Sequence, residues 1–188
     1  GALTTATVSA LTLNTVGLSG TNAITVDGDY TTLNIDNSTT ASTIANVTAS
    51  GATTVNVSGD KLLTLTDNTF AAATAINVTN TAGATFGTTA IGTGVTFTGG
   101  AGAETATFGA TTKAITTGAG DDVLTVTASA LGTGGSIDAG DGTDTLTMTA
   151  TLATAADAST VFAGTISNFE RLSVTGMTAE TINLANLD

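Results

Sequence analysis

Residues 117–125 read Thr117-Gly118-Ala119-Gly120-Asp121-Asp122-Val123-Leu124-Thr125, a glycine-rich turn that leads directly into an alternating apolar strand. Two further segments repeat this order: Gly99-Gly100-Ala101-Gly102-Ala103-Glu104-Thr105-Ala106-Thr107 and Ala139-Gly140-Asp141-Gly142-Thr143-Asp144-Thr145-Leu146-Thr147. Each has an acid at its sixth position and an apolar residue at its eighth. Because glycine adopts left-handed backbone conformations without steric cost, we predict three similar left-handed turns, each followed by a strand. The turns 99–104, 117–122 and 139–144 are called the first, second and third acidic turns below.

The spacing of the sixth-position acids indicates how the turns are arranged. The interval from Glu104 to Asp122 equals two nonapeptides, whereas the interval from Asp122 to Asp144 is slightly longer. A coil built from two nonapeptides has about 18 residues, so we expect successive turns to lie on one edge of a coiled β-structure. The longer second interval predicts a small bulge, placed within Leu131–Gly135. The intervening stretch Phe108–Thr116 has no Gly-Asp turn, so only one edge should carry them.

The rest of the chain also predicts short strands with one buried face. Such strands at regular spacing are typical of an antiparallel sandwich or a β-solenoid. Few Asp-Gly hairpin signals and the small core side chains, with few rings, favour the solenoid. We therefore predict an all-β fold, a right-handed parallel β-solenoid or β-roll. The pairs of apolar residues with a period of two are Ile24/Val26, Leu33/Ile35, Val55/Val57, Leu63/Leu65, Ile76/Val78, Val95/Phe97, Leu124/Val126, Leu146/Met148, Leu172/Val174 and Ile182/Leu184.

The composition excludes several classes of function. The 188 residues include 15 acidic and only 3 basic side chains, which gives a formal net charge of −12. So few cations cannot neutralise a run of phosphates, and no nucleic-acid partner is expected. The absence of His and Cys excludes His-based triads, His-ligated zinc and disulfides. About a quarter of the chain is Thr, which favours strands. Cations are the expected partners.

The acidic turns predict a calcium site. Six acids fall between residues 99 and 144, and turns rich in glycine can direct several carbonyl oxygens to one point. Carboxylate and carbonyl oxygens together form the shell of six or more ligands that Ca²⁺ prefers. The alternative is that the turns merely connect strands, and three aligned copies weigh against it. The predicted metal-binding residues are Gly99, Gly100, Ala101, Gly102, Glu104, Thr117, Gly118, Ala119, Gly120, Asp121, Asp122, Asp138, Ala139, Gly140, Asp141, Gly142 and Asp144.

The turns match the nonapeptide G-G-x-G-x-D-x-U-x of calcium-binding RTX repeats, with departures at Glu104, Thr117 and Ala139. With Gly109–Ile115 and Asn168–Leu172, most of the chain resembles the RTX surface-layer proteins of Gram-negative bacteria. The resemblance implies a calcium-dependent fold, type I secretion to the cell surface, and a two-dimensional lattice of identical copies. It also implies that lipopolysaccharide is bound by a domain outside this chain. This chain would then be an internal or C-terminal-half segment of a surface-layer protein. By residue, it makes Asp122 and Asp144 calcium ligands and places Glu104 in the same position.

Three segments differ in composition. Residues 1–98 predict Thr/Asn-rich coils, residues 99–147 the calcium-binding coils, and residues 148–188 a short helical insertion followed by closing coils. We expect the helix within Thr151–Ala163, capped by Asp157 or Thr154, and a single helical turn at Phe70–Ala75.

Other functions remain as alternatives. An RTX adhesin, or a β-roll that accompanies a secreted polysaccharide-acting enzyme, would share the repeats. Asp27 with Asp29, or Asp36 with Asp60, are candidate acid pairs, but a single Tyr is too little for a sugar-binding groove, and we expect no enzyme activity. Thr-x-Thr pairs are found in ice-binding solenoids, but their central apolar residues should face the core here.

Overall fold

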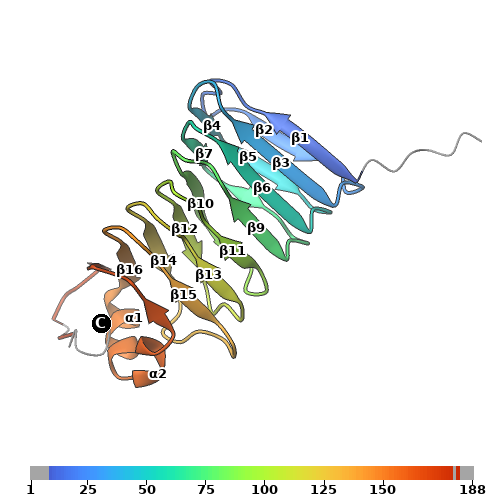
Figure 1. Cartoon of the computed structure of the whole chain (residues 1–188). Helices are drawn as coiled ribbons and strands as arrows, with labels where there is room; N and C mark the ends of the chain where they lie inside the picture. The colour runs from blue at the N-terminus through green and yellow to red at the C-terminus, as the bar shows by residue number, and fades with distance from the viewer. Residues whose placement is uncertain (1–8, 180, 183–188) are drawn as a thin grey trace, which may run out of the picture.

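The computed structural model describes residues 9–179 and 181–182 and shows a parallel β-solenoid. Strands of successive coils stack along one elongated body, from β1 at one end to two short helices at the other (Figure 1). Their pairings are parallel throughout the described sheets. The predicted all-β solenoid is therefore confirmed. In the described part of the chain, neither helix has the length and apolar character needed to cross a bilayer.

Two long sheets run through the solenoid, and each coil after the first contributes one strand to each of them. Sheet A has eight strands, which gives eight coils: β1 (Ala10–Asn14), β3 (Thr32–Asn37), β6 (Thr54–Gly59), β9 (Ala75–Val78), β11 (Thr96–Thr98), β13 (Ala114–Thr116), β15 (Ser136–Asp138) and β17 (Ile166–Ser167). Sheet B has seven strands: β4 (Ser42–Ile44), β7 (Leu63–Leu65), β10 (Ala84–Ile91), β12 (Thr105–Phe108), β14 (Val123–Val126), β16 (Thr145–Thr149) and β18 (Arg171–Thr175).

A third sheet gives the first coils a three-sided cross-section. Sheet C contains β2 (Ala23–Val26), β5 (Asn46–Ala49) and β8 (Asn68–Thr69), and no described strand of a later coil joins it. Coil length varies along the solenoid, as the strand register shows. The register pairs Val55 with Ile76, Phe97 with Ile115 and Ile137 with Ile166. The coil that starts at Phe97 is therefore shorter than the one that starts at Val55, and the coil that contains the helices is the longest of these three.

Alternate strand residues point into the solenoid, as the period of two predicts. In β3, Leu33 and Ile35 are fully buried while the side chains between them are partly exposed. Full burial of such side chains stabilises the fold by about 1.5–3 kcal/mol each. The central residues of the Thr-x-Thr pairs, Leu65, Phe97 and Leu146, are also buried. The threonines therefore lie on the outer surface. Of the predicted pairs, only Ile182/Leu184 extends beyond the described residues.

Three aromatic rings fill the interior of the two-sheet coils. Phe97 from sheet A lies between Phe86 and Phe108 from sheet B, with ring centroids 5.5 Å apart in both pairs and interplanar angles of 81° and 80°. All three rings are fully buried. Edge-to-face pairs of this kind add about 0.5–1.5 kcal/mol to the effect of burial alone.

The predicted helix forms as an insertion between β16 and β17. Helix α1 (Ala150–Asp157) is followed by α2 (Thr160–Ala163), and Phe162 of α2 is fully buried. The predicted cap is wrong. The hydroxyl of Thr149 accepts the backbone N–H of Leu152 at 3.3 Å, because Thr149 is the last extended residue of β16 and places its side chain over the first turn.

The helical turn predicted at Phe70–Ala75 is absent from the structure. A turn closed by a bond from the Ala73 N–H to the Phe70 carbonyl, 3.1 Å long, is followed directly by β9. Pairing of Ala75 with Thr54 of β6 commits this segment to a strand. Tertiary pairing therefore overrides the helix propensity of its alanines.

Candidate metal centre

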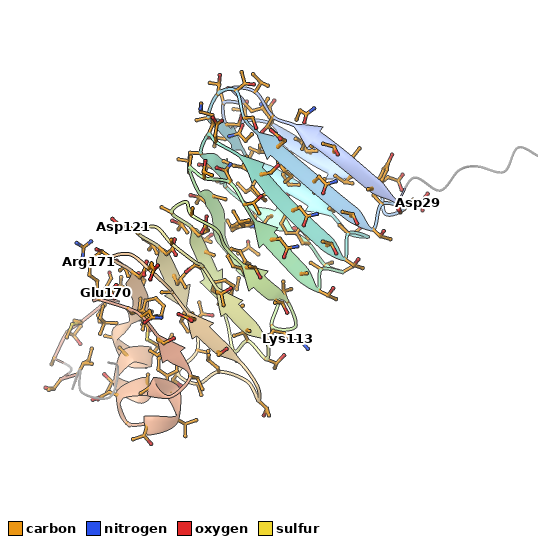
Figure 2. All side chains as sticks on the ribbon, in the orientation of Figure 1. Asp29, Lys113, Asp121, Glu170 and Arg171 are labelled. Carbon is orange, nitrogen blue, oxygen red and sulfur yellow. The ribbon has the colours of Figure 1, made fainter. Side chains whose placement is uncertain are left out.

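All three acidic turns lie on one edge of the solenoid. Each joins a strand of sheet A to the next strand of sheet B: β11 to β12, β13 to β14 and β15 to β16. Figure 2 shows Asp121 and Glu170 on this edge and Lys113 on the opposite one. The prediction that acidic turns occupy a single edge is confirmed. The predicted bulge is present as well, since residues 127–135 connect β14 to β15 where residues 109–113 suffice between β12 and β13.

Backbone hydrogen bonds hold the turns on one another. The N–H of Ala119 donates to the carbonyl of Gly100 at 2.7 Å, and the N–H of Asp141 donates to the carbonyl of Gly118 at 2.8 Å. A further bond from the Gly120 N–H to the Asp141 carbonyl, 2.9 Å long, ties the second turn to the third. The carbonyl groups of adjacent turns are thus brought together along the edge.

The sixth-position acids form a row linked through the backbone. Asp122 Oδ1 accepts the backbone N–H of Glu104 at 2.6 Å, and Asp144 Oδ1 accepts that of Asp122 at 2.7 Å. Glu170 Oε2 accepts the N–H of Asp144 at 2.8 Å. Each carboxylate therefore fixes the turn of the preceding coil. We call Glu104, Asp122 and Asp144, which occupy the sixth positions, the carboxylate row.

The second oxygens of the carboxylate row make no well-formed hydrogen bond with protein atoms, although the Gly100 backbone and the Thr117 hydroxyl lie near enough to lower the pKa of Glu104 and of Asp122, respectively. All three side chains are fully buried, and Asp122 Oδ2, Asp144 Oδ2 and both carboxylate oxygens of Glu104 are unpaired. No basic side chain of the described residues forms an ion pair with these carboxylates. Lys61 Nζ pairs instead with Asp60 Oδ2, at 3.0 Å, in an earlier coil. Buried anions without a counter-charge destabilise a fold by several kcal/mol, so the row requires protons or cations.

Burial raises the pKa of each member of the row. Desolvation, with the nearby charge of Asp122, raises the pKa of Glu104 from 4.5 to about 8. Desolvation also raises the pKa of Asp122 and that of Asp144 above the ordinary range of Asp. At neutral pH the folded protein therefore holds a proton on Glu104 that the unfolded chain has already released.

Glycine is required where the turns pack against one another. Gly118 and Gly140 have φ of +97° and +93°, and a Cβ on Gly140 would lie 2.0 Å from the carbonyl oxygen of Gly118. The prediction of left-handed glycines is wrong for the first turn, where Gly99 and Gly102 have no such φ. These two positions need glycine because neighbouring backbone comes too close for a side chain. A Cβ on Gly99 would lie 2.1 Å from the Thr117 carbonyl oxygen, and a Cβ on Gly102 would lie 2.1 Å from the Gly83 nitrogen.

The other predicted ligands do not join the carboxylate row. Asp121 and Asp141 are exposed, and Asp121 Oδ1 accepts the N–H of Thr143 at 3.0 Å. Asp138 Oδ1 accepts the Asn168 amide at 2.6 Å. Thr117, in place of the first glycine, is buried and its hydroxyl donates to the carbonyl of Ala139 at 2.9 Å. Asp121, Asp138 and Asp141 thus have other partners or face solvent, whereas the Thr117 hydroxyl lies beside the Asp122 carboxylate and acts to lower its pKa.

Glu170 was missed as a site residue, although the sequence contains the signal for it. Strand register pairs Leu146 with Leu172, so Glu170 occupies the position of Asp144 in the next coil. Like the members of the row, it stands two residues before the first inward-facing residue of a sheet-B strand. Searching for this offset, rather than for glycine, would have found it.

The same edge is closed differently in the earlier coils, where neutral amides replace the acids. Asn80 Nδ2 donates to the carbonyls of Ser58 and Lys61 at 3.3 and 2.8 Å. Asn37 Nδ2 donates to the carbonyls of Lys61 and Leu62 at 3.0 and 2.8 Å. Both asparagines are fully buried. Amide N–H groups thus satisfy carbonyls on this edge in the early coils, where the later coils have buried carboxylates instead.

Of the candidate acids of the N-terminal coils, Asp27, Asp29 and Asp60 lie in exposed turns, whereas Asp36 is a partly buried residue of strand β3. Asp27 Oδ1 accepts the N–H of Asp29 at 3.0 Å, so that pair forms a local turn. Asp36 accepts the hydroxyl groups of Ser38 and Ser58 at 2.5 and 3.4 Å, whereas Asp60 pairs with Lys61. Their partners are those of ordinary turn carboxylates.

Oxygen is the only ligand type that the row offers, and its unpaired oxygens fit a hard cation. Within the described residues, no three side chains of His, Cys, Asp or Glu converge on one point, so carboxylates alone do not form a complete shell. No protein-family model matches the chain, and no curated protein is similar enough to count as a relative.

Proposed function

We propose that the acidic turns bind Ca²⁺ and that the chain is a structural, non-enzymatic segment of a self-assembling, RTX-type bacterial surface-layer protein. The observation that carries the calcium part is the set of buried, unpaired carboxylate oxygens of Glu104, Asp122 and Asp144. The lattice part is supported by the resemblance of the sequence to that family, and by the outer surface described below.

The chemistry of the row favours calcium over other cations. Its donors are carboxylate oxygens and the carbonyls of glycine-rich turns, and the chain has no His or Cys to hold a softer metal. Ca²⁺ accepts six to eight oxygens in irregular geometry, whereas Mg²⁺ requires a small octahedral shell and retains its waters. Turns whose conformations differ, as the first and second do, suit the more tolerant ion.

Asp122 occupies the central place in the proposed sites. Its Oδ1 accepts the N–H of Glu104, and its own N–H donates to Asp144 Oδ1. A cation held by Asp122 would therefore order the turn before it and the turn after it. The acidic turns should bind calcium as a coupled unit, with Glu170 orienting the last member.

The outer surface of sheet A suits association between copies. Asn56 Nδ2 donates to Asn34 Oδ1 at 2.8 Å, and Asn77 Nδ2 donates to Asn56 Oδ1 at 2.9 Å. Side chains ordered in this way lose little conformational entropy when a partner covers them. We propose that such faces pack against neighbouring copies at the cell surface, and that calcium fixes the shape of the packed unit.

Hydrogen exchange tests the calcium part. Chelation should increase amide exchange in residues 99–147, calcium should reverse this, and magnesium should not. Residues 32–78, closed by asparagine amides, serve as an internal control and should change little. At free calcium about 100-fold above Kd, each independent site adds about 2.7 kcal/mol to stability. Equal exchange in 99–147 with and without chelator would contradict the proposal.

Electron microscopy tests the lattice part separately. Concentrated protein should form ordered sheets in millimolar calcium and lose them after chelation. Protein that shows calcium-dependent exchange but remains monomeric would retain the metal site and refute the lattice role.

A further inference from the structure

Glu104 differs from the other two members of the carboxylate row in how its oxygens are used. Asp122 and Asp144 each use Oδ1 to accept a backbone N–H of the preceding coil, which leaves one buried oxygen apiece for a cation. Glu104 is fully buried, and neither of its oxygens makes a well-formed hydrogen bond, although the Gly100 backbone lies near enough to lower its pKa. Within the row, Glu104 therefore has two oxygens to offer a metal.

The row begins at Glu104, because the coil before it has no acid at this edge. Strand register pairs Thr85 with Thr105, so Ala84 holds the position of Glu104 in that coil. The turn of residues 79–83 contains no acid, and the amide of Asn80 closes it. A cation beside Glu104 therefore receives no carboxylate from the preceding coil, and a second oxygen from Glu104 compensates for that.

The additional methylene of Glu, compared with Asp, carries its carboxylate back over its own turn. A Cβ on Gly99 would lie 2.7 Å from Glu104 Oε2 and 2.1 Å from the carbonyl oxygen of Thr117. These two oxygens, one from each of two adjacent turns, therefore lie close together with no side chain between them. The buried carboxylate of Asp122 is also near enough for its charge to raise the pKa of Glu104. Oxygens from both turns thus gather where the first and second acidic turns meet, and a cation there would relieve their mutual repulsion.

We propose that Glu104 binds the calcium ion between the first and second acidic turns through both carboxylate oxygens, and that Glu104 thereby determines the preference for Ca²⁺ over Mg²⁺. The inference rests on the proposed calcium function of these turns. Two oxygens of one carboxylate lie too close together for adjacent corners of the octahedral Mg²⁺ shell, whereas the larger, irregular shell of Ca²⁺ accepts them. A bidentate Glu serves calcium in the same way in EF-hand loops.

Glu104→Asp tests the role of the second oxygen, because it keeps the charge and draws the carboxylate back from Gly99. Calorimetric titrations of the full chain with calcium alone and with magnesium alone should show that the ratio of the two affinities falls at least tenfold. Both ions displace the same proton, so this ratio does not depend on the pKa of Glu104. Asp121→Glu is the control, since it changes one methylene at the adjacent exposed acid, and it should change the ratio less than twofold.

Infrared spectroscopy of the unaltered chain gives a second readout, which does not require Glu104→Asp to fold. The sequence has only three Glu, at positions 104, 170 and 180, so labelling with ¹³C-glutamate isolates few carboxylates. Binding through both oxygens brings the antisymmetric and symmetric carboxylate stretches closer together, whereas binding through one oxygen moves them apart. Calcium should bring these bands closer together for one Glu, magnesium should not, and Glu104→Gln should remove the effect.

Two outcomes would overturn the inference and leave the calcium function intact. One is an unchanged affinity ratio in folded Glu104→Asp, and the other is a calcium-bound spectrum in which no pair of Glu bands comes closer together. Hydrogen exchange of residues 99–147 that does not respond to calcium would instead refute the proposed function itself. The two failures are therefore distinguished by whether the unaltered chain binds calcium at all.

Discussion

The backbone N–H of Asp122 donates to Oδ1 of Asp144, 2.7 Å away and one coil further along the solenoid. This bond uses one carboxylate oxygen to fix the preceding turn, and it leaves Oδ2 of Asp144 buried and unpaired. The same arrangement joins Glu104 to Asp122. One oxygen of each Asp therefore maintains the fold, while the other is available to a cation.

Replacing Asp122 with Asn separates these two roles. The amide retains an oxygen that can accept the Glu104 N–H, but it removes a buried negative charge. We expect metal-free Asp122→Asn protein to be more stable than the parent in urea titrations. Its calcium affinity should fall at least tenfold, or about 1.4 kcal/mol, by calorimetry.

Asp121→Asn is the matched control, because it removes the same charge from the adjacent, exposed residue. It should change calcium affinity less than threefold, or by about 0.6 kcal/mol. If both variants weakened calcium binding equally, and added salt abolished the weakening in both, the diffuse charge of the chain would explain the attraction of calcium and the carboxylate row would not.

The pKa of Glu104 predicts how metal-free stability depends on pH. Burial first, and then the charge of Asp122, raises this pKa from 4.5 to about 8 in the folded protein. The folded state therefore binds a proton that the unfolded chain releases. The free energy of unfolding should be greatest below about pH 4.5 and decrease as pH rises towards about 8. The raised pKa values of Asp122 and Asp144 act in the same direction.

Calcium should reverse this trend, because it replaces the protons of the row. Its stabilising effect should grow between about pH 5 and about pH 8.5, as measured by urea unfolding with calcium or with chelator. Glu104→Gln should reduce the loss of stability that the metal-free protein shows as pH rises. A metal-free protein that became more stable across this interval would contradict the assignment of buried, proton-binding carboxylates.

Asn80→Ala should destabilise the early coils whether or not calcium is present. It removes the amide that donates to the carbonyls of Ser58 and Lys61, and leaving such buried groups unsatisfied costs about 1–3 kcal/mol. Asn77→Ala removes a partly exposed amide from the outer surface of sheet A and should lower the free energy of unfolding by less than about 1 kcal/mol. Urea titrations in calcium and in chelator measure both variants. Restoration of Asn80→Ala by calcium would show that this edge also binds metal.

Phe97 is the central ring of the aromatic core, so its truncation should be the most costly in that group. Phe97→Ala should lower the free energy of unfolding by about 3–5 kcal/mol, through loss of burial and of two edge-to-face contacts. Val161→Ala, at a side chain 70 % exposed on α2, should stay within about 0.5 kcal/mol. Similar losses for both variants, measured in calcium, would contradict this account of the core.

Strand periodicity and turn composition predicted the solenoid because both are local properties. Leu33 and Ile35 must face the same side of a strand wherever that strand lies, and Glu104 and Asp122 are separated by one coil in the sequence itself. The edge that carries the acidic turns, and the bulge before β15, could therefore be derived without coordinates.

Only the tertiary structure distinguished Asp122 from Asp121, and Glu170 from an ordinary surface acid. Burial and hydrogen bonding depend on which residues of neighbouring coils meet, and the register between coils of unequal length is set by packing over the whole solenoid. The same reason explains the cap at Thr149 and the turn at Phe70–Ala75. Each depends on a partner strand, or the end of one, that local sequence does not specify. The sequence by itself determined the coiled β-fold and its acidic edge, and tertiary packing decided which oxygens on that edge are buried and unpaired.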